Sequence, residues 1–175
     1  WTTFRALGEH VSSMVLDVFG RVRRQSTLGL QIGGGKNFPK SASEREAWIA
    51  QYSERVPAAR VEALLERYGT RASDVIRAIE IYGDDVLPSL PGFSAQEIAY
   101  LVRAERAVRL DDVLLRRTTL AFAGELSTAR VQEIATVVAE ELGWSAERRE
   151  IEIDRAWNIL RTWHGVEEPT SDVVF

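Results

Sequence analysis

Apolar residues recur at spacings of three and four along most of the chain. The first such stripe is carried by Phe4, Leu7, Val11, Met14, Val15, Val18 and Val22. Comparable stripes follow in 43–56, 57–68, 75–82, 94–109, 128–142 and 145–163. This spacing places apolar side chains on one face of a helix, and no segment shows the sustained two-residue alternation of a strand. The pattern therefore predicts an all-α fold, a multi-helix orthogonal bundle of about six to eight helices.

Glycine and proline interrupt this pattern between residues 25 and 42. Three consecutive glycines at 33–35 and Pro39 are unsuited to a helix interior, so this segment is predicted to be a loop. The run Gly33-Gly34-Gly35-Lys36 lacks the spacing of a phosphate-binding loop, G-x-x-x-x-G-K-S/T. We expect a terminal helix in 1–26, a Gly-rich linker in 27–41, a helical domain in 42–165 and a flexible tail in 166–175.

The stretch 94–120 combines a clear helix start with charges on an apolar face. Ser94 and Glu97 have the spacing of a capping box, in which each side chain satisfies a backbone N–H at the helix start. One face of the helix is then filled by Ile98, Ala99, Leu101, Val102 and Val108. On the same helical wheel Glu105 and Arg109 fall inside this apolar arc, at about 340° and 20° from Ile98. Both charges are therefore expected to face the core.

A second helix is expected in 113–119, with Asp111 or Asp112 as its cap. Charges on an interior face must be paired, because an isolated buried charge shifts its pKa and neutralises. The stretch therefore predicts a structural ion network among Glu105, Arg109, Asp112, Arg116 and Arg117. The alternative is a site for an anionic partner at Arg116 and Arg117, which the spacing alone does not favour.

Composition narrows the range of possible functions. The 175 residues are 45% hydrophobic and 27% charged, as in a globular protein with one core. A net charge of −4 argues against nucleic acid as the main partner. The absence of cysteine excludes disulfides, thiolate metal sites and cysteine nucleophiles. The chain has only two histidines, His10 and His164, and they lie far apart in the sequence. This argues against a histidine-based metal site and a Ser-His-Asp triad, so we expect no metal.

Two other function classes have some support in the sequence. Leu65, Gly69 and Val75 stand at the offsets of a DNA-binding helix-turn-helix, with Arg71 and Arg77 on the would-be recognition helix. The unit 58–83 nevertheless has no net charge, and position 65 is bulky where a small residue is usual. A free-standing protein-protein interaction module would instead use the stripe from Phe4 to Val22 as its binding face, and would dimerise through it.

The central stretch also resembles a known family. In FAD-dependent, membrane-associated glycerol-3-phosphate dehydrogenases and the related alpha-glycerophosphate oxidases, the C-terminal helical domain contains E-I-x-Y-x-V-x-x-E, then R, then D-D-x-L-x-R-R-T. The matching residues here are Glu97, Ile98, Tyr100, Val102, Glu105, Arg109, Asp111, Asp112, Leu114, Arg116, Arg117 and Thr118. The match is long and without gaps.

The start of the chain extends this resemblance. In that family the flavin domain ends with G-K-x-T-T-Y/F-R, a segment that touches the flavin and enters a helix. Residues 1–5, W-T-T-F-R, are similar to the end of this motif. The resemblance implies that Thr2 and Thr3 are a remnant of the flavin-contacting segment. It also implies that the first helix is left over from a preceding flavin domain and that the chain is a fragment.

The resemblance implies a function for a parent protein and a different one for this chain. The parent would use FAD to oxidise glycerol 3-phosphate to dihydroxyacetone phosphate and pass electrons to a membrane quinone. The chain has no G-x-G-x-x-G or predicted strands, so we expect no bound cofactor and no catalytic residues. It would support the FAD-binding domain of the same polypeptide. The implied location is cytoplasmic, with the parent peripheral on the inner face of the cell membrane.

Overall fold

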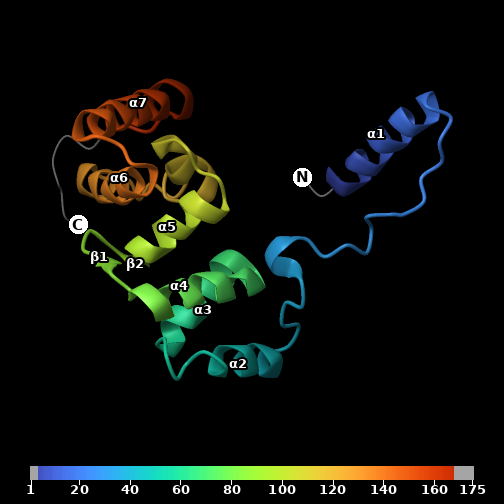
Figure 1. Ribbon diagram of the computed structural model, residues 1–175, viewed down its shortest axis with the longest axis horizontal. Helices are drawn as coiled ribbons and strands as arrows, with labels where there is room; N and C mark the ends of the chain where they lie inside the picture. Colours follow the sequence, from blue (N-terminus) through green and yellow to red (C-terminus); the bar gives the residue numbers. More distant parts are fainter. Residues whose placement is uncertain (1–3, 168–175) are drawn as a thin grey trace.

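The computed structural model describes residues 4–167 and is mostly helical (Figure 1). Its seven α-helices are α1 (Phe4–Val18), α2 (Ala42–Ala50), α3 (Ala58–Tyr68), α4 (Ala72–Tyr82), α5 (Ala95–Ala104), α6 (Thr128–Leu142) and α7 (Ala146–His164). Short 3-10 turns occupy Gly33–Gly35 (η1) and Gly69–Arg71 (η2), and a π-helical turn occupies Asp112–Arg117 (η3). The predicted all-α class is confirmed. The expectations for Thr2, Thr3 and residues 168–175 lie outside the described residues.

A small hairpin between α4 and α5 is the exception to the helical pattern. Strand β1 (Val86–Leu87) pairs antiparallel with β2 (Leu90–Ser94). The hairpin was not predicted, because its strands are too short for alternation to show and Pro88 and Pro91 interrupt them. Three of its apolar residues, Leu87, Leu90 and Phe93, are buried in the main core, whereas Val86 is exposed.

The helical body has two hydrophobic cores with an aromatic boundary. The larger core joins the hairpin to α5, η3, α6 and α7, and the smaller one joins α3 and α4 with the segment that follows α2. Figure 1 shows α6 and α7 at one end of the body and α2 at the other. Tyr68 and Tyr100 pack against both cores, with ring centroids 6.0 Å apart. The two cores therefore form one continuous body.

Serine caps set where four of the helices begin. Ser94, Ser127 and Ser145 accept hydrogen bonds from backbone N–H groups three residues on, at 3.1–3.3 Å. For α2 the sequence spacing also offers Ser43 with Glu46 as a capping box, but the structure does not use it. Ser41 is the cap, with the Glu44 carboxylate accepting a 2.7 Å hydrogen bond from the N–H of Lys40. Both serine–glutamate pairs have the spacing of a capping box, so the sequence pattern alone does not decide which serine is the cap.

Helix α5 ends sooner than its apolar pattern predicted. It stops at Ala104, and Arg106 has a left-handed φ of 56°. The continuation of the helix to residue 109 was therefore wrong, and Val108 is exposed instead of buried. The turn allows Ala107 and Leu110 to enter the core. It is fixed by Asp112, whose carboxylate accepts hydrogen bonds from the N–H groups of Val108 and Arg109.

The glycine run of the linker packs directly against the helical body. A Cβ atom at Gly34 would lie 1.9 Å from the carbonyl oxygen of Tyr68, and one at Gly69 would lie 2.3 Å from the carbonyl oxygen of Gly34. Gly69 also has a positive φ of 58°. The hydroxyl of Thr70 donates a 2.6 Å hydrogen bond to the carbonyl of Lys36. The glycines thus permit a close backbone crossing between linker and body.

Candidate functional site

A completely buried carboxylate, Glu97, lies at the start of α5. Its oxygens accept hydrogen bonds from Arg60 Nη2 at 2.8 Å, Arg67 Nη1 at 2.5 Å and Tyr68 Oη at 2.7 Å. The Ser94 half of the predicted capping box is confirmed, but Glu97 is turned toward α3 instead of back toward Ser94. Burial raises the pKa of the Tyr68 hydroxyl, and the negative charge of the Glu97 carboxylate raises it further. Tyr68 is therefore held as a neutral donor.

The two arginines of this cluster also hold the hairpin. Both donate to the carbonyl of Gly92, Arg60 Nη1 at 2.8 Å and Arg67 Nη2 at 2.7 Å. Arg60 also pairs with Asp84 at 3.1 Å, and the Arg67 guanidinium lies 3.9 Å from the ring centroid of Phe93. Burial alone would lower the pKa of Arg60. The negative charges of Glu97 and Asp84 outweigh burial and raise this pKa above its ordinary value. This cluster joins α3, the hairpin and α5.

A second cluster joins the segment around η3 to α7. Buried Glu152 accepts hydrogen bonds from Arg109 Nη1 at 2.5 Å and Arg148 Nη2 at 2.6 Å. Buried Asp111 accepts one from Arg116 Nη1 at 2.8 Å and another from Arg155. Burial pushes the pKa of the Asp111 carboxyl upward, but these two arginines outweigh it and hold the pKa below its ordinary value.

The five residues of the predicted ion network are therefore distributed over separate contacts. Arg116 does meet Asp112, at 2.9 Å, besides Asp111. Arg117 donates mainly to the backbone carbonyl of Glu105, at 3.0 and 3.1 Å, and reaches its carboxylate only at 3.9 Å. The Glu105 side chain is 39% exposed, so the expectation that it faces the core was wrong. Arg109 pairs with Glu152 on α7 instead of with this group.

The partners that sequence reasoning missed are Glu152, Arg148 and Arg155, all on α7. Glu152 stands four residues before Ala156 and eight before Leu160, both completely buried. It therefore lies on the apolar face of α7, and a helical wheel of that segment carries the signal. Its pairing with Arg109 could not be predicted, because it depends on how two segments 43 residues apart pack together.

These two clusters are suited to holding elements together. Each buried carboxylate is already paired with two or three arginines, which leaves its oxygens little capacity for a substrate. Within residues 4–167, no three His, Cys, Asp or Glu side chains are grouped so as to hold a metal ion. The clusters thus fix the relative positions of the helices.

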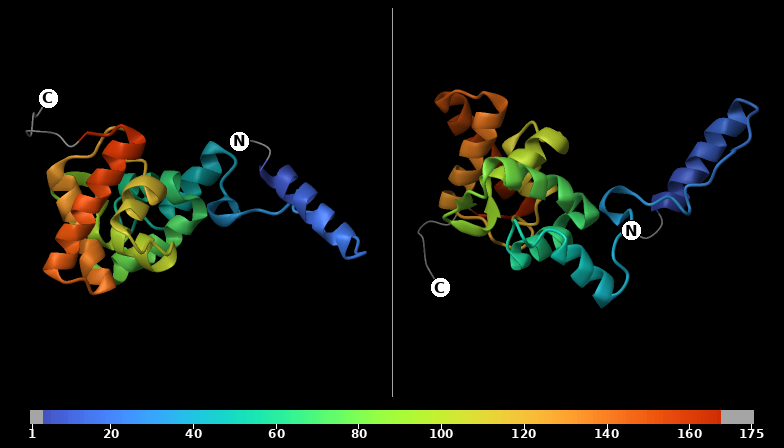
Figure 2. Two further views of the ribbon diagram at one scale, coloured as in Figure 1. Left: turned by 90° about the horizontal axis from the view of Figure 1, so that it is seen from above. Right: turned by 60° about the horizontal axis from the view of Figure 1, so that its bottom comes forward.

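The first helix presents an uncovered apolar face. Its stripe, Phe4, Leu7, Val11, Met14, Val15 and Val18, is between 48% and 83% exposed. Figures 1 and 2 show α1 standing apart from the helical body, with an extended linker between them. Packing into this chain's own core is therefore not the use of the stripe. Among the described helices, none is both long enough and apolar enough to cross a membrane.

The opposite, polar face of α1 is covered by its own chain. The segment that follows the helix turns back along it, and the Glu9 carboxylate accepts hydrogen bonds from the Ser26 hydroxyl, at 2.6 Å, and from Thr27. Arg23 Nε donates to the Ser13 hydroxyl at 3.2 Å. Hydrogen bonds from Ser26 and Thr27 lower the pKa of Glu9. The return segment thus leaves the apolar face open.

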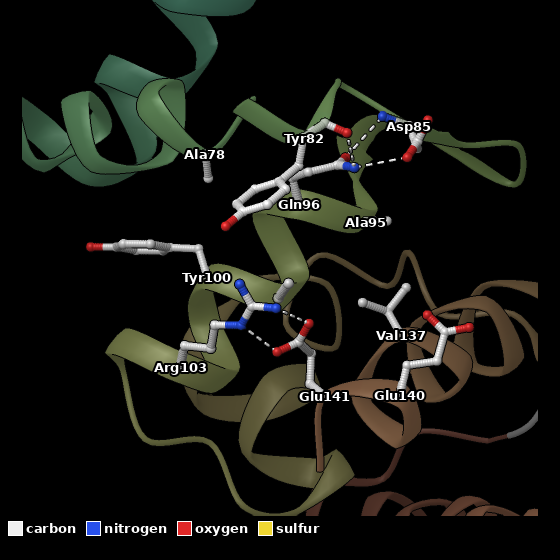
Figure 3. Close-up of a pocket in the computed structure, with 11 residues that line it drawn as sticks. Ala78, Tyr82, Asp85, Ala95, Gln96, Tyr100, Arg103, Val137, Glu140 and Glu141 are labelled. Carbon is white, nitrogen blue, oxygen red and sulfur yellow. Dashed lines mark hydrogen bonds and ion pairs between the residues drawn. The ribbon is translucent and has the colours of Figure 1, made fainter. Parts of the chain in front are cut away.

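A cleft of about 460 Å³ lies between α4, α5 and α6 (Figure 3). Its lining includes Tyr82, Tyr100 and the ion pair of Arg103 with Glu141, whose hydrogen bonds are 2.5 and 2.6 Å long. None of the residues predicted as a site lines this cleft.

Fold and site together define a helical domain whose buried charges fix its architecture and whose first helix offers an open apolar face. Residues 25–149 match the family described as the C-terminal domain of alpha-glycerophosphate oxidase, and the chain belongs to this family. The resemblance noted from the sequence is thereby confirmed.

Similar proteins carry the name glycerol-3-phosphate dehydrogenase. That of Synechocystis is 28% identical over 162 residues, covering 88% of this chain and 28% of the relative. That of Mycobacterium leprae is 39% identical over 100 residues, covering 55% and 16%. The mitochondrial protein of Rattus norvegicus is 26% identical over 176 residues, covering 91% and 22%. The chain thus spans less than a third of each of these relatives, and no solved structure matches it.

Proposed function

We propose that this chain is the C-terminal supporting domain of a longer FAD-dependent glycerol-3-phosphate dehydrogenase. A preceding flavin domain of the same polypeptide would oxidise glycerol 3-phosphate to dihydroxyacetone phosphate and pass the electrons to a membrane quinone. The family match and the names of the relatives support this assignment. So does the share of each relative that the chain spans, because most of their length remains for a catalytic domain.

The observation that carries the proposal is the exposed apolar face of α1. Full burial of one large apolar side chain stabilises by about 1.5–3 kcal/mol, so six partly exposed ones amount to a substantial interface. Because the return segment already covers the polar face of α1, the apolar face is the side of this helix that is open for packing against another domain. We assign this face to the flavin domain, with the helical body covering one side of that domain. FAD belongs to the parent, and Thr2 and Thr3 would end its flavin-contacting segment.

The test uses the native polypeptide, captured from the source cell with an antibody raised against this chain. The captured protein should show flavin absorbance and should reduce a quinone analogue when glycerol 3-phosphate is added. A captured protein with no flavin and no such activity would refute the proposal. The recombinant 175-residue chain serves as the control, and we expect it to bind no FAD.

The exposed face of α1 also supports a second candidate, a free-standing module that dimerises through this helix. Sedimentation of the isolated chain distinguishes the two. A stable dimer that Val11→Asp dissociates, together with a native polypeptide of this chain's own size, would favour the module. A monomer favours the supporting domain.

A further inference from the structure

The cleft between α4, α5 and α6 has the features of a binding site that the supporting role does not use. Its apolar floor is built from small residues, Ala78, Ala95, Ala99 and Val137. Larger side chains at these positions would fill the space, so the alanines leave a hollow of about 460 Å³. The hollow is partly open to solvent. Figure 3 shows the side chains that line it.

Two tyrosines border this hollow from different helices, Tyr82 from α4 and Tyr100 from α5 (Figure 3). Tyr100 is held in place because its hydroxyl accepts a 3.2 Å hydrogen bond from Arg71 Nε. Tyr82 is 65% exposed. Aromatic ring faces attract cations, and they stack well on the planar guanidinium of arginine.

The ionisable side chains of the cleft leave an excess of negative charge. Arg103 and Glu141 neutralise each other through their two hydrogen bonds. Asp85 accepts a 2.8 Å hydrogen bond from the neutral side chain of Gln96 and has no ion-pair partner within residues 4–167. Glu140 is exposed and has no hydrogen-bond or ion-pair partner within residues 4–167. The cleft therefore has two carboxylates without a cationic partner on one side and two aromatic rings on the other (Figure 3).

We propose that this cleft is a docking site for an arginine side chain, presented by an apolar peptide segment of a partner protein. The guanidinium would lie between the tyrosine rings on one side and Glu140 and Asp85 on the other, while its methylene groups cover the alanine floor. Ile81 and Val86, the chain neighbours of Tyr82 and Asp85, are exposed and would cover apolar residues flanking the arginine. This inference is independent of the flavoenzyme assignment.

The experiment titrates the ¹⁵N-labelled chain with the peptide acetyl-Gly-Leu-Arg-Leu-Gly-amide up to millimolar concentration. Amide shifts should change in 95–103 and 137–141, the parts of α5 and α6 that line the cleft. A peptide with citrulline in place of arginine should bind at least about tenfold more weakly, because its neutral urea group loses both ionic and cation–π attraction. Equal binding of the two peptides would overturn the proposal.

Variants separate the contributions of charge and space. Glu140→Gln should weaken binding about threefold, the loss expected for an exposed ion pair. Ala99→Leu should abolish binding by filling the hollow, and Glu54→Gln, an exposed position outside the cleft, should leave binding unchanged. An unchanged affinity of Glu140→Gln would contradict the assignment. So would N-acetyl-arginine amide binding as tightly as the peptide, since this would indicate a small-molecule site.

Discussion

Glu97 is a single buried carboxylate that holds two arginines and a tyrosine from α3. Its removal leaves Arg60, whose side chain is only 13% exposed, without its buried partner. We predict that Glu97→Ala lowers the free energy of unfolding by about 3–5 kcal/mol, as for a broken buried ion pair. Urea denaturation measures this.

The matched control is Glu105→Ala, at a carboxylate that lies in the same motif but is 39% exposed. Arg117 is bound mainly to the backbone carbonyl of residue 105, which alanine retains. We expect a change within about 0.5 kcal/mol. Equal effects of the two substitutions would contradict the assignment of Glu97 as the structural charge.

Asp111 predicts a dependence of stability on pH. Its folded-state pKa lies below the ordinary value of 3.8, so its contribution is complete above that pH. The contribution is lost as the pH falls below 3.8 toward the folded-state pKa. Asp111→Asn should therefore be less stable than the parent chain at pH 7, and the gap should narrow below pH 4. Denaturation series at several pH values test this, and a gap of constant size would contradict it.

Among the elements, the linker turn η1 depends on the absence of a side chain at Gly34. A Cβ there would lie 1.9 Å from a backbone carbonyl, which cannot move as a flexible side chain could. We predict that Gly34→Ala detaches the linker from η2 and makes residues 25–40 more sensitive to limited proteolysis. Gly29→Ala is the control, because no atom lies within 4 Å of its added Cβ. Equal cleavage of both variants would contradict the close crossing.

The elements also show how far the sequence determines this fold. The stripes of α3, α4, α6 and α7 predicted their helices, because each buries one face against the core. The end of α5 escaped prediction, since the turn at Arg106 depends on the Asp112 carboxylate and on burial of Leu110. The ion pairs of Arg109 and Asp111 with α7 escaped for the same reason, as they depend on tertiary packing.

The molecule as a whole consists of a helical body with two hydrophobic cores and a first helix whose apolar face is exposed. We predict that Val11→Asp changes the unfolding free energy of the isolated chain by less than about 0.5 kcal/mol, because Val11 is 48% exposed and belongs to neither hydrophobic core. Val61→Asp, at a completely buried position, should destabilise by several kcal/mol, as expected for a charge placed in a core. Thermal and urea denaturation measure both. A large loss of stability in Val11→Asp would mean that α1 packs within its own chain.

The size of the native polypeptide tests the central claim most directly. An antibody raised against this chain, used on an immunoblot of the source cell, should detect a polypeptide several times longer than 175 residues. We predict this result because the chain is proposed to be one domain of a longer flavoenzyme, and it spans only 16–28% of the length of two of its relatives. A single band at the size of the chain itself would contradict the account.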